Sequence, residues 1–168
     1  MSQSAAVPDP LERLRDERLQ IDQLFDSFAR RQQNPGHSAA ETARLSAWIC
    51  TLLRVHDDLE TRVLEPALTA RLVAGGHGHP ALARAAARRV AVREAMDRVE
   101  ASPRGPDHWA EMATLARQAR AWFRTEEREV FALANALAGG TALDLAALDE
   151  QLGRRQEDLL SAGRGAQR

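Results

Sequence analysis

Apolar residues recur along most of the chain at alternating steps of three and four, the spacing that places them on one face of an α-helix. Four long stretches show this pattern, and we predict a helix in each, at about residues 10–33, 38–74, 80–101 and 107–138. The apolar faces form seams of the kind that pack at shallow angles in helix bundles. The predicted fold class is therefore all-α.

Residues that start and stop helices divide these stretches. Asp9 can cap the first helix ahead of Pro10, and Ser38 with Glu41 forms a capping box for the second. Clusters of glycine, proline and small polar residues separate the helices at 34–36, 75–76, 102–106 and 139–140. Pro66 lies inside the second helix, where it predicts a kink or a break.

Short connections make successive helices antiparallel, so we predict an up-down-up-down four-helix bundle over residues 10–138. Residues 139–168 form a separate C-terminal region, in which Thr141 can cap a short fifth helix from Ala142 to about Leu160. We expect residues 1–9 and the last few residues to be disordered. The fifth helix is amphipathic, which suits packing on the bundle or formation of a homodimer.

Composition narrows the class of protein. Hydrophobic residues make up 44% of the 168 residues and aromatic residues only 4%, a mixture that favours helices over sheets. The net charge of -1 gives no general electrostatic case for binding nucleic acid or an anionic membrane, and no apolar run approaches the ~20 residues of a membrane span. The single cysteine, Cys50, and an N-terminus unlike a secretory signal predict a cytoplasmic protein. All 23 basic residues are arginine, which together with the excess of alanine suggests a GC-rich bacterial genome.

Charged residues interrupt the apolar seams near the middle of each helix. Glu17, His56, Arg89 and Glu126 occupy seam positions, and Glu60 follows His56 by four residues, one turn along the same helix face. Since mid-helix positions lie at similar heights in a bundle, we expect these groups to meet in one layer. Inward-facing carboxylates and imidazoles are the groups from which helix bundles build metal sites.

Each of these residues also has a plainer interpretation. Glu17 and Glu126 have charged neighbours in the sequence, so each could lie at a solvated edge of its helix. A buried histidine is more often hydrogen-bonded than bound to metal, and Arg89 could extend its side chain to solvent. The sequence alone leaves both interpretations open.

Three segments, LRDERLQIDQLFDSF, LLRVHDDLETRVLEPAL and AWFRTEEREVFAL, together resemble the hemerythrin-like (HHE) cation-binding family over roughly residues 10–138. The resemblance implies a four-helix bundle that holds a non-haem di-iron centre through histidines and two carboxylates. His56 and Glu60 match the ligands of the family's second helix. Glu126 matches the carboxylate of the family's fourth helix.

The chain departs from the family at the other ligand positions. Glu17 stands where the first helix would provide a histidine, Arg89 or Val90 (depending on register) where the third would, and Trp122 where the fourth would. An indole would fill space beside one metal, and a guanidinium would bring positive charge to the place of a cation. We therefore do not expect reversible oxygen binding at a di-iron centre.

These residues support two hypotheses. In the first, the core is an ion-pair network without a cofactor, in which Arg89 neutralises Glu60 and either Glu126 or Glu17, and the protein is a regulatory or interaction module for an unknown protein partner. In the second, Glu17, His56, Glu60 and Glu126 hold one iron, manganese or zinc ion in a redox or gas-sensing protein. The sequence shows no nucleophile–base pair and no glycine-rich phosphate loop, so we lean against an enzyme.

Overall fold

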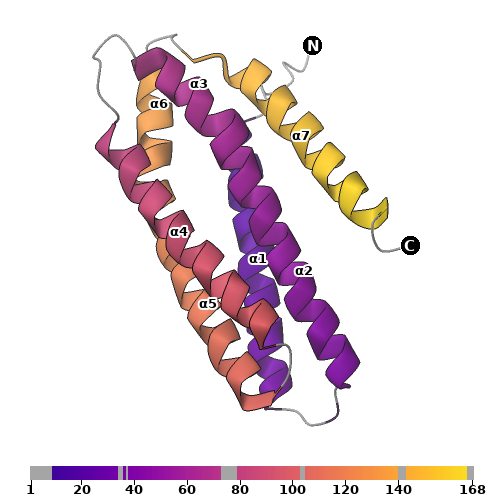
Figure 1. Cartoon of the computed structure of the whole chain (residues 1–168). Helices are drawn as coiled ribbons and strands as arrows, with labels where there is room; N and C mark the ends of the chain where they lie inside the picture. Colours follow the sequence, from indigo (N-terminus) through magenta and orange to yellow (C-terminus); the bar gives the residue numbers. More distant parts are fainter. Residues whose placement is uncertain are drawn as a thin grey trace, which may run out of the picture.

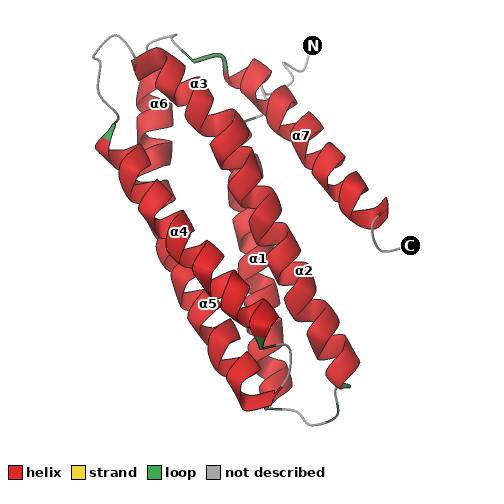
Figure 2. Cartoon of the chain, in the orientation of Figure 1, coloured by secondary structure: helices red, strands yellow, loops and turns green. Residues whose placement is uncertain are grey.

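The computed structural model describes residues 9–33, 36, 38–72, 79–102, 105–139 and 143–165. Within these ranges the secondary structure is helical and contains no strand, which confirms the all-α prediction (Figure 2). Of the ends predicted to be disordered, residues 1–8 and 166–168 lie outside the described residues, as does Thr141, whereas Asp9 is described and caps α1. The elements are α1 (Pro10–Gln32), α2 (Ala39–Leu59), η1 (Glu60–Leu64), α3 (Glu65–Leu72), α4 (Pro80–Ala101), α5 (Gly105–Thr125), η3 (Glu126–Val130), α6 (Phe131–Gly139) and α7 (Leu145–Gly165).

The caps agree with the sequence at the first two helices and differ at the last. Asp9 accepts a hydrogen bond from the Leu11 amide at the start of α1, and the capping box of Ser38 and Glu41 starts α2. The last helix begins at Leu145 rather than Ala142, because Asp144 accepts a hydrogen bond from the Ala147 amide. It also continues past Leu160, to Gly165.

Two of the predicted long helices contain a π-helical turn. In η1 the Glu65 amide donates to the Glu60 carbonyl, and in η3 the Phe131 amide donates to the Glu126 carbonyl. Each bond spans five residues instead of four, so one extra residue is accommodated in the turn. The interruption predicted near Pro66 is therefore η1, whereas nothing in the sequence indicated η3.

The long helices lie side by side around two apolar clusters (Figure 1). One cluster joins α1, α2, α4 and α5 through residues such as Ile21, Ile49, Val92 and Leu115. The other lies further along the molecule and adds the residues of η1, α3, α6 and α7. In α1, α4 and α5–η3, a buried charged residue falls in the sequence between the members of the two clusters, and in α2 His56 lies just past their boundary, between Val55 and Leu59 of the second cluster. The apolar core is thus divided by a charged layer.

Helix α7 packs on this chain, against α1, α2 and η1 (Figure 1). Its Leu148 and Leu152 are buried in the second apolar cluster. Two arginine–aspartate pairs fix it further: Arg13 bonds Asp149 at 2.9 and 3.2 Å, and Arg155 bonds Asp58 at 2.7 and 3.0 Å.

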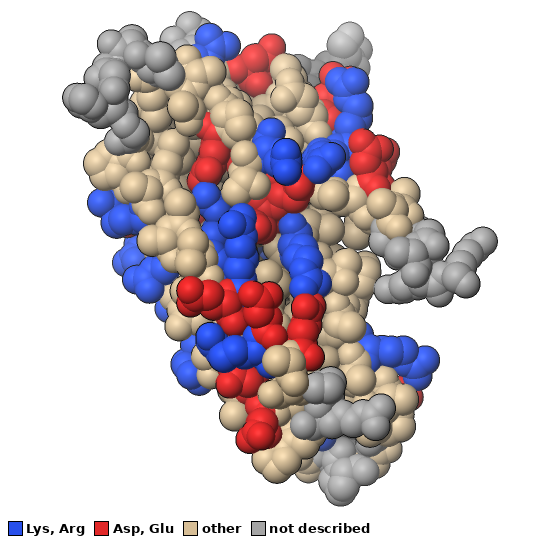
Figure 3. All heavy atoms as spheres, viewed as in Figure 1, with Lys and Arg blue, Asp and Glu red and all other residues tan. Residues whose placement is uncertain are grey.

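Acidic and basic side chains are interspersed on the surface, and neither sign forms a broad continuous patch in the view of Figure 3. Many are paired between helices, as Arg93 with Asp57 and Arg54 with Glu100. Among the described helices, none is both long enough and apolar enough to cross a membrane.

Candidate functional site

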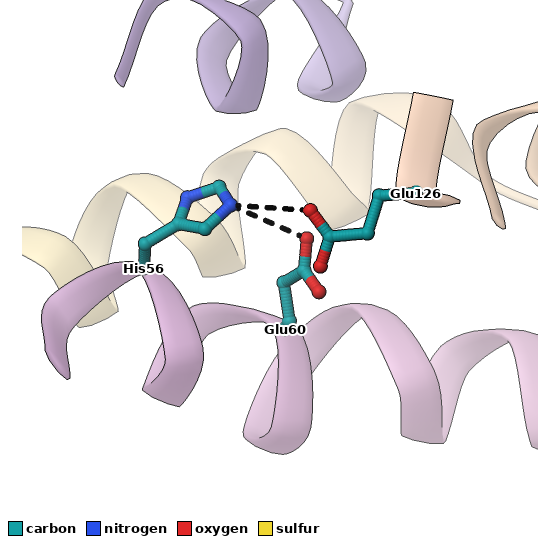
Figure 4. A group of neighbouring side chains, drawn as sticks. All are labelled: His56, Glu60 and Glu126. Atoms are coloured by element: carbon teal, nitrogen blue, oxygen red, sulfur yellow. Dashed lines mark ion pairs between the residues drawn. The ribbon is translucent and has the colours of Figure 1, made fainter. Parts of the chain in front are cut away.

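Three of the predicted site residues lie together in the buried interior (Figure 4). His56 comes from α2, Glu60 from the first residue of η1, and Glu126 from the first residue of η3. His56 Nε2 lies 3.4 Å from Glu60 Oε1 and 3.6 Å from Glu126 Oε2. One potential ligand atom from each residue lies within 4.8 Å of the others, and all three side chains are almost completely buried. The expectation that these seam residues would share one layer is confirmed for this trio.

Glu17 lies on the other side of the imidazole. Its Oε2 is 3.0 Å from His56 Nδ1, and its Oε1 accepts a hydrogen bond from Gln156 of α7. Glu17 is therefore outside the group formed by Glu60 and Glu126. Its position suits a residue that orients His56, since a carboxylate at one ring nitrogen fixes the imidazole while the other nitrogen faces the site.

Arg18, rather than Glu17, is the residue of α1 that enters the charged layer, and it was not among the predicted site residues. Arg18 Nη2 lies 3.2 Å from Glu126 Oε2 and 3.9 Å from Glu60 Oε1, and its Nε is 3.5 Å from His56 Nε2. Two aromatic rings flank the guanidinium, with Phe131 at 3.9 Å and Phe123 at 5.7 Å from their centroids. The guanidinium thus contacts all three residues of the trio.

A second pattern of seam positions in α1 includes Arg18. The buried residues of this helix include Leu14, Arg18, Ile21, Phe25 and Phe28, which again follow steps of four and three. The seam that was predicted through Glu17 would continue with Ile21 and Leu24, but Glu17 and Leu24 are only partly buried. The two patterns differ by a rotation of the helix that apolar spacing alone does not resolve.

Arg89 is the residue of α4 that faces the layer, and Val90 is exposed, which settles the register of this helix. Its Nη1 lies 2.6 Å from Glu65 Oε1 and 3.6 Å from Glu60 Oε2, and its Nε lies 3.4 Å from Asp57. Among the described residues, the carboxylates that pair with Arg89 thus include Glu60 but neither Glu126 nor Glu17. The predicted neutralisation of Glu126 falls to Arg18.

Trp122 is completely buried beside His56, with the two ring centroids 5.2 Å apart in an edge-to-face arrangement. Phe123 makes a similar contact with the imidazole at 5.4 Å. These rings fill the space next to His56 with apolar surface. Such surroundings lower the local dielectric and strengthen every electrostatic interaction in the layer.

The charges of the layer shift one another's pKa. Burial opposes ionisation of Glu60, but neighbouring Glu126, His56 and Arg18 outweigh it and lower its pKa to about 2. Burial and the negative charge of Glu60 raise the pKa of Glu126 well above its usual value. Burial disfavours the imidazolium form of His56, yet Glu126, Glu17 and Glu60 raise its pKa well above the usual value. The two carboxyl groups therefore titrate as a coupled pair, with the pKa of Glu126 above that of Glu60.

Several charged groups in the layer are close enough to form ion pairs but are not oriented to form hydrogen bonds. Both carboxylate oxygens of Glu60 and of Glu126 are buried, and none has a hydrogen-bonding partner among the described residues. The same holds for Arg18 Nη2 and Arg89 Nη1. Buried polar atoms without such partners are uncommon in native proteins and often mark a site with a further role.

No protein-family model, curated protein or solved structure matches this chain. The site must therefore be interpreted from its own geometry. One imidazole and two carboxylates converge, while a guanidinium lies among them and an indole stands beside them. This set does not fit a di-iron centre, which needs more nitrogen and oxygen ligands and room for two ions.

Proposed function

We propose that the chain is a hemerythrin-like protein in which a charged layer without metal replaces the di-iron site, and that it works as a regulatory or interaction module. In this proposal the four long helical stretches run up-down-up-down, with α7 as an added cover. The convergence of His56, Glu60 and Glu126 from the second and fourth stretches supports the proposal, because these are the positions that match the family's ligands. The role as a module is an analogy from the fold.

The observation that carries the proposal is the position of Arg18. Its guanidinium lies against Glu126, Glu60 and His56 and is nearly as buried as they are. Arg89 approaches Glu60 from α4 and is also buried. Two fixed cations thus compensate the carboxylates from two sides, so that the layer needs no metal ion for charge balance.

A double-mutant cycle tests whether these ion pairs hold the layer together. We would measure the free energy of unfolding for the wild type, Arg18→Met, Glu60→Gln and the double variant. Because both groups are desolvated, we expect the cycle to give a coupling energy of about 1 kcal/mol or more. The same cycle on the exposed pair Arg54 and Glu100 should give about 0.2–1 kcal/mol at most. A coupling energy of zero between Arg18 and Glu60 would contradict the ion-pair core.

A second candidate function is binding of one iron, manganese or zinc ion, with a redox or gas-sensing role. The unpartnered oxygens of Glu60 and Glu126 and the adjacent Nε2 of His56 favour it. His56, Glu60 and Glu126 would hold the ion, and Glu17 would orient His56 from its outer side. Such an ion would supply Lewis-acid or one-electron chemistry. Binding would require Arg18 to leave its place and both His56 and Glu126 to be deprotonated.

A further inference from the structure

Arg18 faces the atoms through which the three potential ligands approach one another. It is within 3.2 Å of Glu126, 3.5 Å of His56 and 3.9 Å of Glu60. Arg89 differs in this respect, because it touches only Glu60 of the trio and makes its shortest contact, 2.6 Å, with Glu65. The two arginines are therefore not equivalent, although both are buried cations beside the same carboxylate.

The trio behind Arg18 is close to the dimensions of a cation site. Its ligand atoms lie within 4.8 Å of one another, whereas two atoms each bonded to one zinc ion at about 2.1 Å can be at most about 4.2 Å apart. Small side-chain rotations would close the difference. The donors are suitable as well, since one imidazole nitrogen with carboxylate oxygens is a set that zinc, manganese and iron accept.

We infer that Arg18 is the residue that keeps the buried His56–Glu60–Glu126 group free of metal, and that removing its guanidinium converts the group into a site for one divalent cation. The inference deepens the proposed metal-free function and rests on it. Without Arg18, Glu60 and Glu126 lose the cation that lies against both, and the place beside the Phe131 ring becomes vacant. A divalent ion would then restore the charge balance and provide bonds for oxygens that have no hydrogen-bonding partner among the described residues.

The test compares Arg18→Met with Arg89→Met in tag-free, full-length protein. Methionine is a flexible apolar residue that suits irregular gaps in a core, so each variant removes a buried guanidinium while filling part of its space. We would add zinc chloride, remove unbound ions, and measure zinc by elemental analysis and helicity by circular dichroism. Arg18→Met should retain about one zinc per chain, and adding His56→Ala should remove it, whereas the wild type and Arg89→Met should retain less than about a tenth. Zinc should also raise the melting temperature of Arg18→Met alone.

A folded Arg18→Met protein that retains no zinc would overturn the inference and leave the metal-free function standing. About one zinc per chain in the wild type would overturn both, because Arg18 would then not exclude the ion. If Arg18→Met fails to fold without metal, zinc should restore its helicity, and Arg18→Gln should behave in the same way. Failure of zinc to restore either variant would also count against the inference.

Discussion

At the scale of single residues, the charged layer depends on arginines that are held in place from several sides. Arg89 is 4% exposed, and its guanidinium lies between Asp57, Glu60 and Glu65. Its pKa stays above the ordinary arginine value, because Glu65 and the other carboxylates outweigh the effect of burial. Loss of such a cation would leave carboxylates uncompensated in a medium of low dielectric.

We predict that Arg89→Leu will destabilise the fold by roughly 3–5 kcal/mol, the usual effect of breaking a buried charge pair by removing one partner. Chemical denaturation followed by circular dichroism would measure the free energy of unfolding. Arg93→Leu is the matched control, since Arg93 lies on the same helix and pairs with the same Asp57 but is half exposed. Its effect should stay below about 1 kcal/mol. Equal losses of unfolding free energy for the two substitutions would show that burial of Arg89 does not increase its contribution to stability.

The thiol of Cys50 gives a prediction about pH. Burial raises its pKa to about 11, so folding favours the protonated thiol. This contribution to stability is complete below the ordinary pKa and is lost as the pH rises from there through about 11. The chain has no tyrosine and no lysine, so fewer groups than usual titrate in that range.

Between pH 9 and 11 the wild type should therefore lose up to about 1.4 kcal/mol of stability per pH unit through this thiol. Cys50→Ala will be less stable at neutral pH because it leaves a small cavity, but its stability should fall less steeply with pH. Urea denaturation at a series of pH values measures both slopes. Parallel curves for the two proteins would contradict the raised thiol pKa.

In α1 the sequence did not predict which charged side chain faces the core. The charged neighbours Glu17 and Arg18 are one residue apart, and either fits a seam of apolar positions. Which one enters the core is decided by Glu60, Glu126 and the ring of Phe131, and these lie far away in the sequence. His56 and Glu126 could be predicted because each stands between apolar residues on both sides of its seam, and Glu60 because it follows His56 by one helical turn.

At the scale of elements, the two π-helical turns position the carboxylates and rotate the helices that continue from them. Glu60 and Glu126 are the first residues of η1 and η3. From Val130, the last residue of η3, the buried residues continue with Phe131 and Ala134, whereas the uninterrupted α-helical pattern continues with Leu133 and Leu137. The structure leaves Leu133 and Leu137 only partly buried. The sequence could not show this shift, because apolar residues occur at both sets of positions.

The shift can be tested with two substitutions in the same helix. Phe131 is completely buried and contacts the Arg18 guanidinium, so Phe131→Ala should cost about 3–5 kcal/mol of stability. Leu133→Ala, at a partly buried site, should cost clearly less than the 2–5 kcal/mol typical of a fully buried leucine, roughly 1 kcal/mol. The free energy of unfolding of each variant is the measurement. A larger loss of stability for Leu133→Ala than for Phe131→Ala would support an uninterrupted α-helix and contradict η3.

At the scale of the whole molecule, the helical content, the caps of α1 and α2 and the bounds of α4 could be predicted from local signals in the sequence. The placement of α7 could not, because an amphipathic helix can cover its own bundle or another surface. Leu148 and Leu152, together with the pair of Arg13 and Asp149, bring it onto α1 and α2. Through Gln156 it also touches Glu17, and so it covers the outer side of His56.

The whole molecule therefore consists of two apolar clusters that meet at a charged layer, with cations supplied by the chain itself. A layer balanced in this way should contain no metal ion. Elemental analysis of tag-free wild-type protein, expressed with iron, manganese and zinc supplied, tests it most directly. We predict less than about a tenth of a metal ion per chain, since Arg18 and Arg89 already balance the carboxylates. About one ion per chain, lost on substitution of His56 by alanine, would contradict the account.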